Sequence, residues 1–133
     1  MILVDTSVMI GYLKGSKDDI YEKLDEIIDR EIPFGINCYI YQELLQSAKD
    51  VKEYSQLQEY LSTLPFYNLR NGKVSFEKAA YLYFVCRKNG ITIRSTIDLL
   101  IAETAIENDL YLLHNDKDFT NLGKIVKELK IYT

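Results

Sequence analysis

The chain has 133 residues, of which 47% are hydrophobic and 27% charged, as is ordinary for one globular domain over residues 1–133. No stretch approaches the roughly 20 apolar residues that span a bilayer, and no signal peptide is evident, so we expect a cytoplasmic protein. The net charge of −4 argues against a simple basic nucleic-acid binder, unless clustered acids hold divalent cations. Cys38, Cys86 and His114 are the only cysteines and histidine, so zinc sites and histidine triads are poorly supported and two buried free thiols are expected.

Short apolar runs alternate with segments in which apolar residues recur at helical spacing. In chain order, the pattern predicts a strand at 2–4, helices at 6–14 and about 17–28, a strand at 34–37, helices at 40–48 and 51–64, a strand start at 66–69, helices at 74–89 and 95–105, and strands at 110–113 and 129–132. Strands separated by helices predict an α/β fold with a parallel, helix-covered sheet.

Several residues mark the expected ends of these elements. Pro33 and Pro65 each precede an aromatic residue that opens a short apolar segment, where a missing backbone donor is tolerated. Gly90 fits the left-handed position just after a helix. Ser95 fits an N-cap, and Asp98 completes a pattern similar to a capping box.

Four acidic residues are expected at one edge of this sheet. Asp5 directly follows the first strand, Glu43 lies in the helix after the second, Asp98 opens the helix after Gly90, and Asp116 follows strand 110–113. In parallel α/β sheets the working site lies beyond the carboxyl ends of the strands. The four carboxylates are therefore predicted to converge on one cleft.

The helical position of Asp98 strengthens this expectation. Residues three, four and seven positions further on are all apolar, so the carboxylate stands over the buried face of its helix. A charge there is costly unless a cation or hydrogen-bond donors compensate it. Taken singly, Asp98 and Asp5 could each be a helix cap and Glu43 could be solvated; the joint placement is harder to explain structurally.

Carboxylates without histidine or thiolate ligands favour hard cations such as Mg²⁺ or Mn²⁺. Two such ions about 3.5–4 Å apart can activate a water and stabilise the leaving oxygen of a phosphodiester. Metal-assisted hydrolysis of a phosphodiester is the chemistry that best suits this set of residues.

Four stretches of the chain carry a resemblance to a known family. They are MILVDTSVMIGYL at the N-terminus, YQELL around Glu43, STIDLLIAETA around Asp98, and LYLLHNDKDF near the end. In order and spacing the sequence resembles the PIN-domain ribonucleases, specifically the VapC-type toxins of toxin–antitoxin pairs. The resemblance implies a three-layer α/β/α fold with a parallel sheet of four to five strands, and an Mg²⁺ or Mn²⁺ site formed by Asp5, Glu43, Asp98 and Asp116.

The resemblance also implies roles for neighbouring residues. Thr6 or Ser7 would support the site by hydrogen bonding, and Asp118 would be an outer ligand or, as we favour, a cap for the segment 119–124. His114 departs from the family, which often has Thr or Ser there; a strand-end histidine with a partly exposed ring is expected. Arg94 is the best candidate for a phosphate contact, with a surface ion pair as the alternative.

By resemblance the protein would cut tRNA or another structured RNA, form a homodimer and bind an antitoxin protein. That partner would lay a helix or tail across the groove and could insert a basic side chain among the acids. Two other functions stay open on the sequence alone. One is an Asp-based phosphatase or receiver domain, although Ser7 stands where such a phosphatase needs a second aspartate. The other is a non-catalytic PIN-like module that binds RNA or protein.

Overall fold

Four short parallel strands form the centre of the computed structural model, which describes residues 1–133. They are β1 (Ile2–Val4), β2 (Phe34–Gly35), β3 (Tyr111–Leu113) and β4 (Lys130–Ile131). The strand order is β2-β1-β3-β4, with β4 at one edge, and Leu3 pairs with both Gly35 and Leu112. The predicted α/β fold with a parallel sheet is confirmed.

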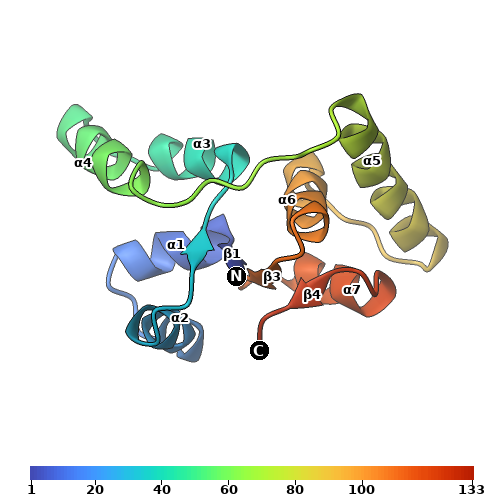
Figure 1. The fold of residues 1–133 in the computed structure, drawn as a ribbon, viewed down its shortest axis with the longest axis horizontal. Coiled ribbons are helices and arrows are strands. Elements are labelled where there is room, and N and C mark those ends of the chain that lie inside the picture. The colour runs from blue at the N-terminus through green and yellow to red at the C-terminus, as the bar shows by residue number, and fades with distance from the viewer.

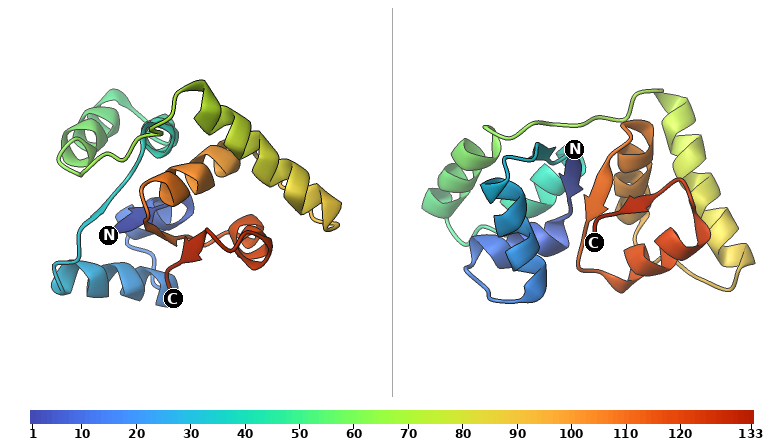
Figure 2. Two further views of the ribbon diagram at one scale, coloured as in Figure 1. Left: turned by 45° about the vertical axis from the view of Figure 1, so that its right-hand side comes forward. Right: turned by 60° about the horizontal axis from the view of Figure 1, so that its bottom comes forward.

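Seven helices surround this sheet. They are α1 (Thr6–Leu13), α2 (Asp19–Asp29), α3 (Cys38–Gln46), α4 (Val51–Leu61), α5 (Lys73–Lys88), α6 (Thr96–Glu107) and α7 (Lys117–Ile125). In Figure 1 the elements from β1 to α4 lie on the left, and those from α5 to β4 lie on the right. The segment 62–72 crosses the top and joins the two halves, while the strands and both termini lie near the centre (Figures 1 and 2). None of the helices is long and apolar enough to span a membrane.

The predicted strand start after Pro65 forms only one bridge. Phe66 pairs in parallel with Ile36, just beyond the end of β2. A Cβ on Gly35 would lie 2.2 Å from the carbonyl oxygen of Pro65, so only glycine allows this close approach of the two segments. The sheet therefore has four strands and the beginning of a fifth.

The helix ends agree with the sequence in part. Gly90 follows the C-cap of α5 with a φ of +78°, as predicted. Ser95 is the N-cap residue of α6, but its side chain makes no capping hydrogen bond and the expected capping box with Asp98 does not form. Helix α4 ends at Leu61, three residues earlier than its apolar pattern indicated.

The core gathers both halves of the molecule around β1 and α6. All three residues of β1 are buried, and seven consecutive residues of α6, from Leu99 to Ala105, are buried as well. A helix buried all round belongs to the middle of a domain, and α6 accordingly contacts α3, α5, α7 and β3. Cys86 is in this core, but Cys38 is exposed, and the expectation of two buried thiols is wrong for it.

Candidate active site

Asp5 directly follows the last residue of β1 and is the N-cap of α1, so it lies at the strand end and also caps the helix, as the sequence suggested. Its Oδ2 accepts hydrogen bonds from the backbone N–H of Ser7 (3.0 Å) and from Ser7 Oγ (2.6 Å). The Ser7 hydroxyl oxygen in turn accepts from the N–H of Asn115 (2.9 Å), in the loop after β3. Asp5 is only 4% exposed, and burial raises the pKa of its carboxyl; the bonds from Ser7 oppose this rise, and repulsion from Glu43 adds to it.

Glu43 reaches the same edge from α3. Its Oε1 accepts a hydrogen bond of 2.8 Å from the hydroxyl of Thr6, the first residue of α1. The side chain is half-buried rather than solvated. Thr6 and Ser7 thus hold one carboxylate each, as the sequence suggested for one or the other of them.

Asp98 lies in the first turn of α6 and makes no side-chain hydrogen bond or ion pair. Burial raises the pKa of its carboxyl to about 7, and repulsion from Asp5, Asp116, Glu43 and Asp118 contributes in that order. This carboxyl therefore feels the charge of every other acid predicted for the site.

Asp116 approaches from the loop after β3 as the N-cap of α7. Its Oδ1 accepts from the N–H of Asp118 (2.9 Å), so the prediction that Asp118 would be the cap is wrong. The N–H of Asp116 donates to Nδ1 of His114 (3.1 Å). His114 is partly exposed, as expected, and burial lowers the pKa of its ring while the charge of Asp116 opposes that shift.

Asp118 is held inside the first turn of α7 and is 7% exposed. Its Oδ2 accepts from the N–H of Arg94 (3.3 Å) and pairs with Arg94 Nε at 3.6 Å. The Arg94 side chain is 80% exposed. Arg94 therefore forms the ion pair that was the alternative to a phosphate contact, with Asp118 as its partner, and its guanidinium remains accessible to solvent.

The sequence analysis did not single out Asn37, which connects α3 to α6. It is 2% exposed, caps α3 through the N–H of Ile40 (2.9 Å), and donates from Nδ2 to the hydroxyl of Thr104 on α6 (3.1 Å). It thereby ties the helix that carries Glu43 to the helix that carries Asp98. A polar residue at the end of β2 and before a helix, as Asp5 is after β1, was the signal available.

The donor chemistry at this edge fits a hard divalent cation, although the acids stand apart. No group of three or more of these side chains is close enough together to hold one ion as placed. Asp5, Glu43 and Asp116 each bond through one carboxylate oxygen, and none of these three or Asp98 has a basic partner. Like charges without a counter-ion repel one another, which accounts for the spacing.

Comparison with known proteins decides the family. The family model described as "PIN domain" matches residues 2–125. The chain belongs to the PIN-domain family. Among curated relatives, Ribonuclease VapC11 of Mycobacterium tuberculosis is 30% identical over 126 residues, which cover 94% of this chain and 93% of the relative. This extent of similarity shows membership of the VapC ribonucleases within the PIN-domain family.

Solved structures share the fold of this PIN domain. A VapBC2 complex from Rickettsia felis, bound to a DNA fragment from its promoter, has a TM-score of 0.74 at 23% identity, covering 99% of this chain and 98% of that one. VapBC-1 from nontypeable Haemophilus influenzae gives 0.72 at 20% identity, covering 99% and 97%. The phosphatase and receiver alternatives are set aside by this membership.

Proposed function

We propose that this PIN-domain protein is a divalent-metal-dependent endoribonuclease and the toxin of a toxin–antitoxin pair, acting in the cytoplasm on tRNA or another structured RNA. The observation that carries the proposal is the acidic edge itself. Burial and then repulsion from Asp5, Asp116 and Glu43 raise the pKa of Asp98, and no basic side chain forms an ion pair with any of these four acids. Carboxylates that are partly buried and have no basic partner are stabilised by binding a divalent cation.

In this proposal Asp5, Glu43, Asp98 and Asp116 hold Mg²⁺ or Mn²⁺. The cation would polarise the phosphodiester and activate the attacking water. Ser7 and Thr6 keep one oxygen of Asp5 and of Glu43 in place by hydrogen bonds, which leaves the other oxygen of each carboxylate available to the cation.

Arg94 is proposed to position the RNA. Its N–H and Nε hold Asp118 beside Asp98, and most of its side chain is open to solvent. A guanidinium at the border of an acidic centre can bind a phosphate through paired N–H groups. Substitution by Ala should raise KM for RNA more than it lowers kcat.

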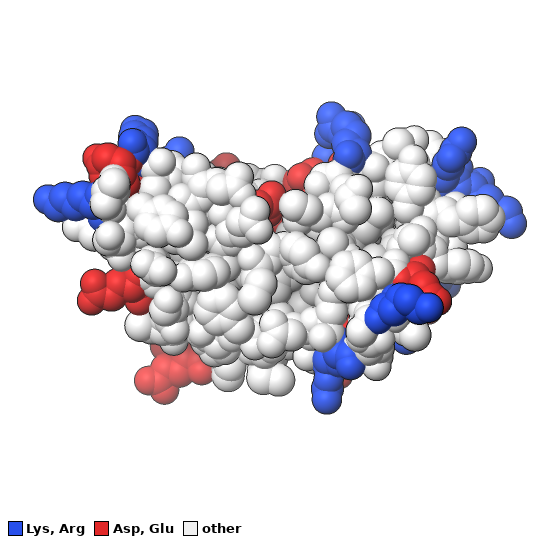
Figure 3. Space-filling model, turned by 90° about the horizontal axis from the view of Figure 1, so that it is seen from above, with Lys and Arg blue, Asp and Glu red and all other residues white.

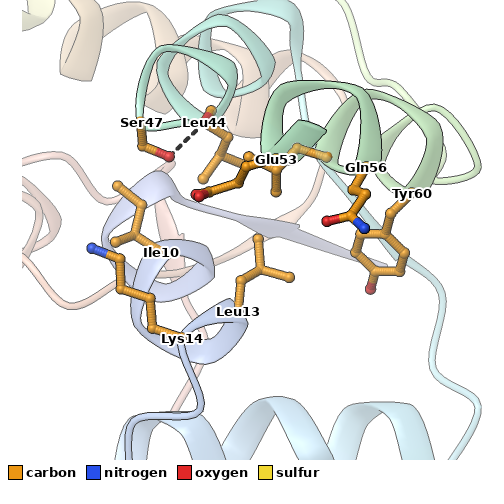
Figure 4. A pocket seen from close by; sticks show the side chains of 9 residues that line it. Ile10, Leu13, Lys14, Leu44, Ser47, Glu53, Gln56 and Tyr60 are labelled. Carbon is orange, nitrogen blue, oxygen red and sulfur yellow. Dashed lines mark hydrogen bonds between the residues drawn. The ribbon is translucent and has the colours of Figure 1, made fainter. Parts of the chain in front are cut away.

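The antitoxin is proposed to bind a groove between α1, α3 and α4 (Figure 4). This groove has a volume of about 440 Å³, and Ile10, Leu13, Leu44 and Leu57 supply most of its apolar wall. Leu44 is the neighbour of Glu43, so a helix lying in the groove can extend a basic side chain toward the acids. Leu57→Asp should abolish inhibition by the antitoxin and leave RNA cleavage by the free chain unchanged.

A second copy of the chain is proposed to cover the face shown in Figure 3. Its centre carries no charged side chains, while Lys, Arg, Asp and Glu lie toward the rim. The segment 62–72 crosses this face, and beside it a cavity of about 260 Å³ is lined only by uncharged residues, including Phe76, which is 49% exposed. Phe76→Glu should convert a dimer into a monomer in light scattering.

The nuclease is tested by cleavage of a labelled total tRNA pool with Mg²⁺, Mn²⁺ or EDTA. Discrete products that require metal and vanish in Asp5→Asn and Glu43→Gln support the proposal. A matched control is Asp29→Asn, an exposed aspartate that makes no hydrogen bond or ion pair. Equal cleavage by parent and active-site variants would remove these residues from the reaction, and no cleavage of any RNA would favour the non-catalytic module.

A further inference from the structure

A second acidic site lies on the other side of α6, in a cavity of about 790 Å³ between α5, α6 and the end of α7. Glu103 and Glu107 line this cavity. Glu103 is five residues beyond Asp98, which places it roughly 140° around the helix from the acidic edge. Glu103 is 3% exposed, and no basic side chain forms an ion pair with either glutamate.

Glu107 is held in place but not saturated. Its Oε1 accepts from the N–H of Arg70 (2.7 Å) and from the hydroxyl of Ser75 (2.9 Å). Its Oε2 is buried and has no hydrogen-bond partner within the usual distance. Burial raises the pKa of Glu107, but hydrogen bonding with Glu103, Arg70, Ser75 and Asn71 outweighs this and lowers it. Burial, and then the hydrogen bond and charge of Glu107, raise the pKa of Glu103 to about 8. Near neutral pH the two residues therefore share one proton and carry one negative charge inside the cavity.

We propose that this cavity binds a guanidinium group, which replaces the proton between Glu103 and Glu107. Two carboxylates one helical turn apart match the planar fork of a guanidinium, which is weakly hydrated and stacks on aromatic rings. The walls supply such surroundings through Tyr81, which is 63% exposed, and Leu82. A metal ion is a poorer occupant, because Oε1 of Glu107 is already occupied by Arg70 and Ser75 and hard cations take six or more oxygens.

Proton balance gives this proposal a measurable signature. The guanidinium pairs with two carboxylates only if the proton on Glu103 leaves to solvent, so one proton is released for each group bound. Affinity should then rise about tenfold per pH unit from pH 6 to 8 and level off above. The other charged groups that face the cavity are Lys78 from α5, and Lys127 and Glu128 beyond α7.

The test is calorimetric titration of the full chain with butylguanidinium at pH 6 to 9, in buffers of different ionisation enthalpy. Butylammonium is the ligand control, and a capped Ala-Arg-Ala peptide shows whether a free molecule or an arginine side chain is the better source of the group. Glu103→Gln should weaken binding at pH 9 at least tenfold and abolish the pH dependence. It should fold, because the amide can donate to Glu107 in place of the carboxyl.

Two further variants separate the site from its surroundings. Glu128→Gln at the rim should bind like the parent, and Tyr81→Ser should weaken binding of butylguanidinium without changing proton release. Absence of binding by the parent, binding independent of pH, or equal binding by Glu103→Gln would overturn the proposal. None of these outcomes depends on RNA cleavage, so the guanidinium site and the proposed nuclease activity are tested independently.

Discussion

Replacing Asp98 by Asn should make the protein more stable and inactive at the same time. The carboxyl of Asp98 is half-buried among four other acids, and its pKa is raised from 3.8 to about 7. The folded chain therefore holds the proton more tightly than the unfolded chain does. The stability contributed by this group is fully present below pH 4 and is lost as the pH rises through 7.

The size of the effect follows from that shift. A difference of about 3 pKa units at 1.36 kcal/mol each gives an upper value of about 4 kcal/mol, and solvent access to the side chain reduces it to roughly 2–3 kcal/mol. Asn has the shape of the neutral acid and avoids this cost. For a chain of this length, the midpoint of thermal unfolding should rise by about 6–9 °C at pH 7.5.

The assay is thermal unfolding of the parent and Asp98→Asn from pH 4 to 8 in EDTA. The two should be equally stable near pH 4 and diverge steadily as the pH rises, whereas Asp29→Asn should follow the parent throughout. Saturating Mn²⁺ should narrow the gap, since the cation stabilises only the chain that retains its ligands. Parallel curves, or an Asn variant less stable than the parent at pH 7.5, would refute the reasoning.

Three other substitutions probe the frame around the site. Ser7→Ala removes the hydroxyl that links Asp5 to Asn115 and should lower the free energy of unfolding in urea by about 1–2 kcal/mol, together with RNA cleavage; unchanged stability would mean that the link is weak. Gly35→Ala places a Cβ 2.2 Å from a backbone carbonyl and should lower the free energy of unfolding by about 1–3 kcal/mol; unchanged stability would contradict the close approach of the two segments. Glu31→Gly, at a φ of +55° after α2, should instead add about 0.5–1 kcal/mol, and a loss on thermal unfolding would contradict the strain inferred there.

The sequence predicted the fold well because its signals were local. The pattern of apolar residues predicted six of the seven helices, with α7 foreseen only as a capped segment at 119–124, and Gly90 marked the end of α5 where a left-handed residue is needed. Asp5, Glu43, Asp98 and Asp116 were proposed because each lies after, or in the helix that follows, an element ending at one edge of a parallel sheet. Topology alone was sufficient to bring them near one another.

What the sequence missed depends on contacts between distant segments. The sequence favoured Asp118 as the cap of the segment 119–124, whereas Asp116 is the N-cap of α7 and Asp118 is paired with Arg94, 24 residues earlier in the chain. The bond of Asn37 to Thr104 joins residues 67 positions apart, which no periodicity reveals. The burial of Glu103 is also not visible in the sequence, because its exposure is determined by α5 and α7.

We propose that Asp5, Glu43, Asp98 and Asp116 together form one metal centre. The most direct measurement is Mn²⁺ binding followed by electron paramagnetic resonance, for the parent and for each single Asp→Asn or Glu→Gln variant. We expect the parent to bind Mn²⁺, every variant to bind it at least tenfold more weakly, and Asp29→Asn to bind it as the parent does. A parent that binds no Mn²⁺, or four variants that bind it as tightly as the parent, would contradict a shared metal centre.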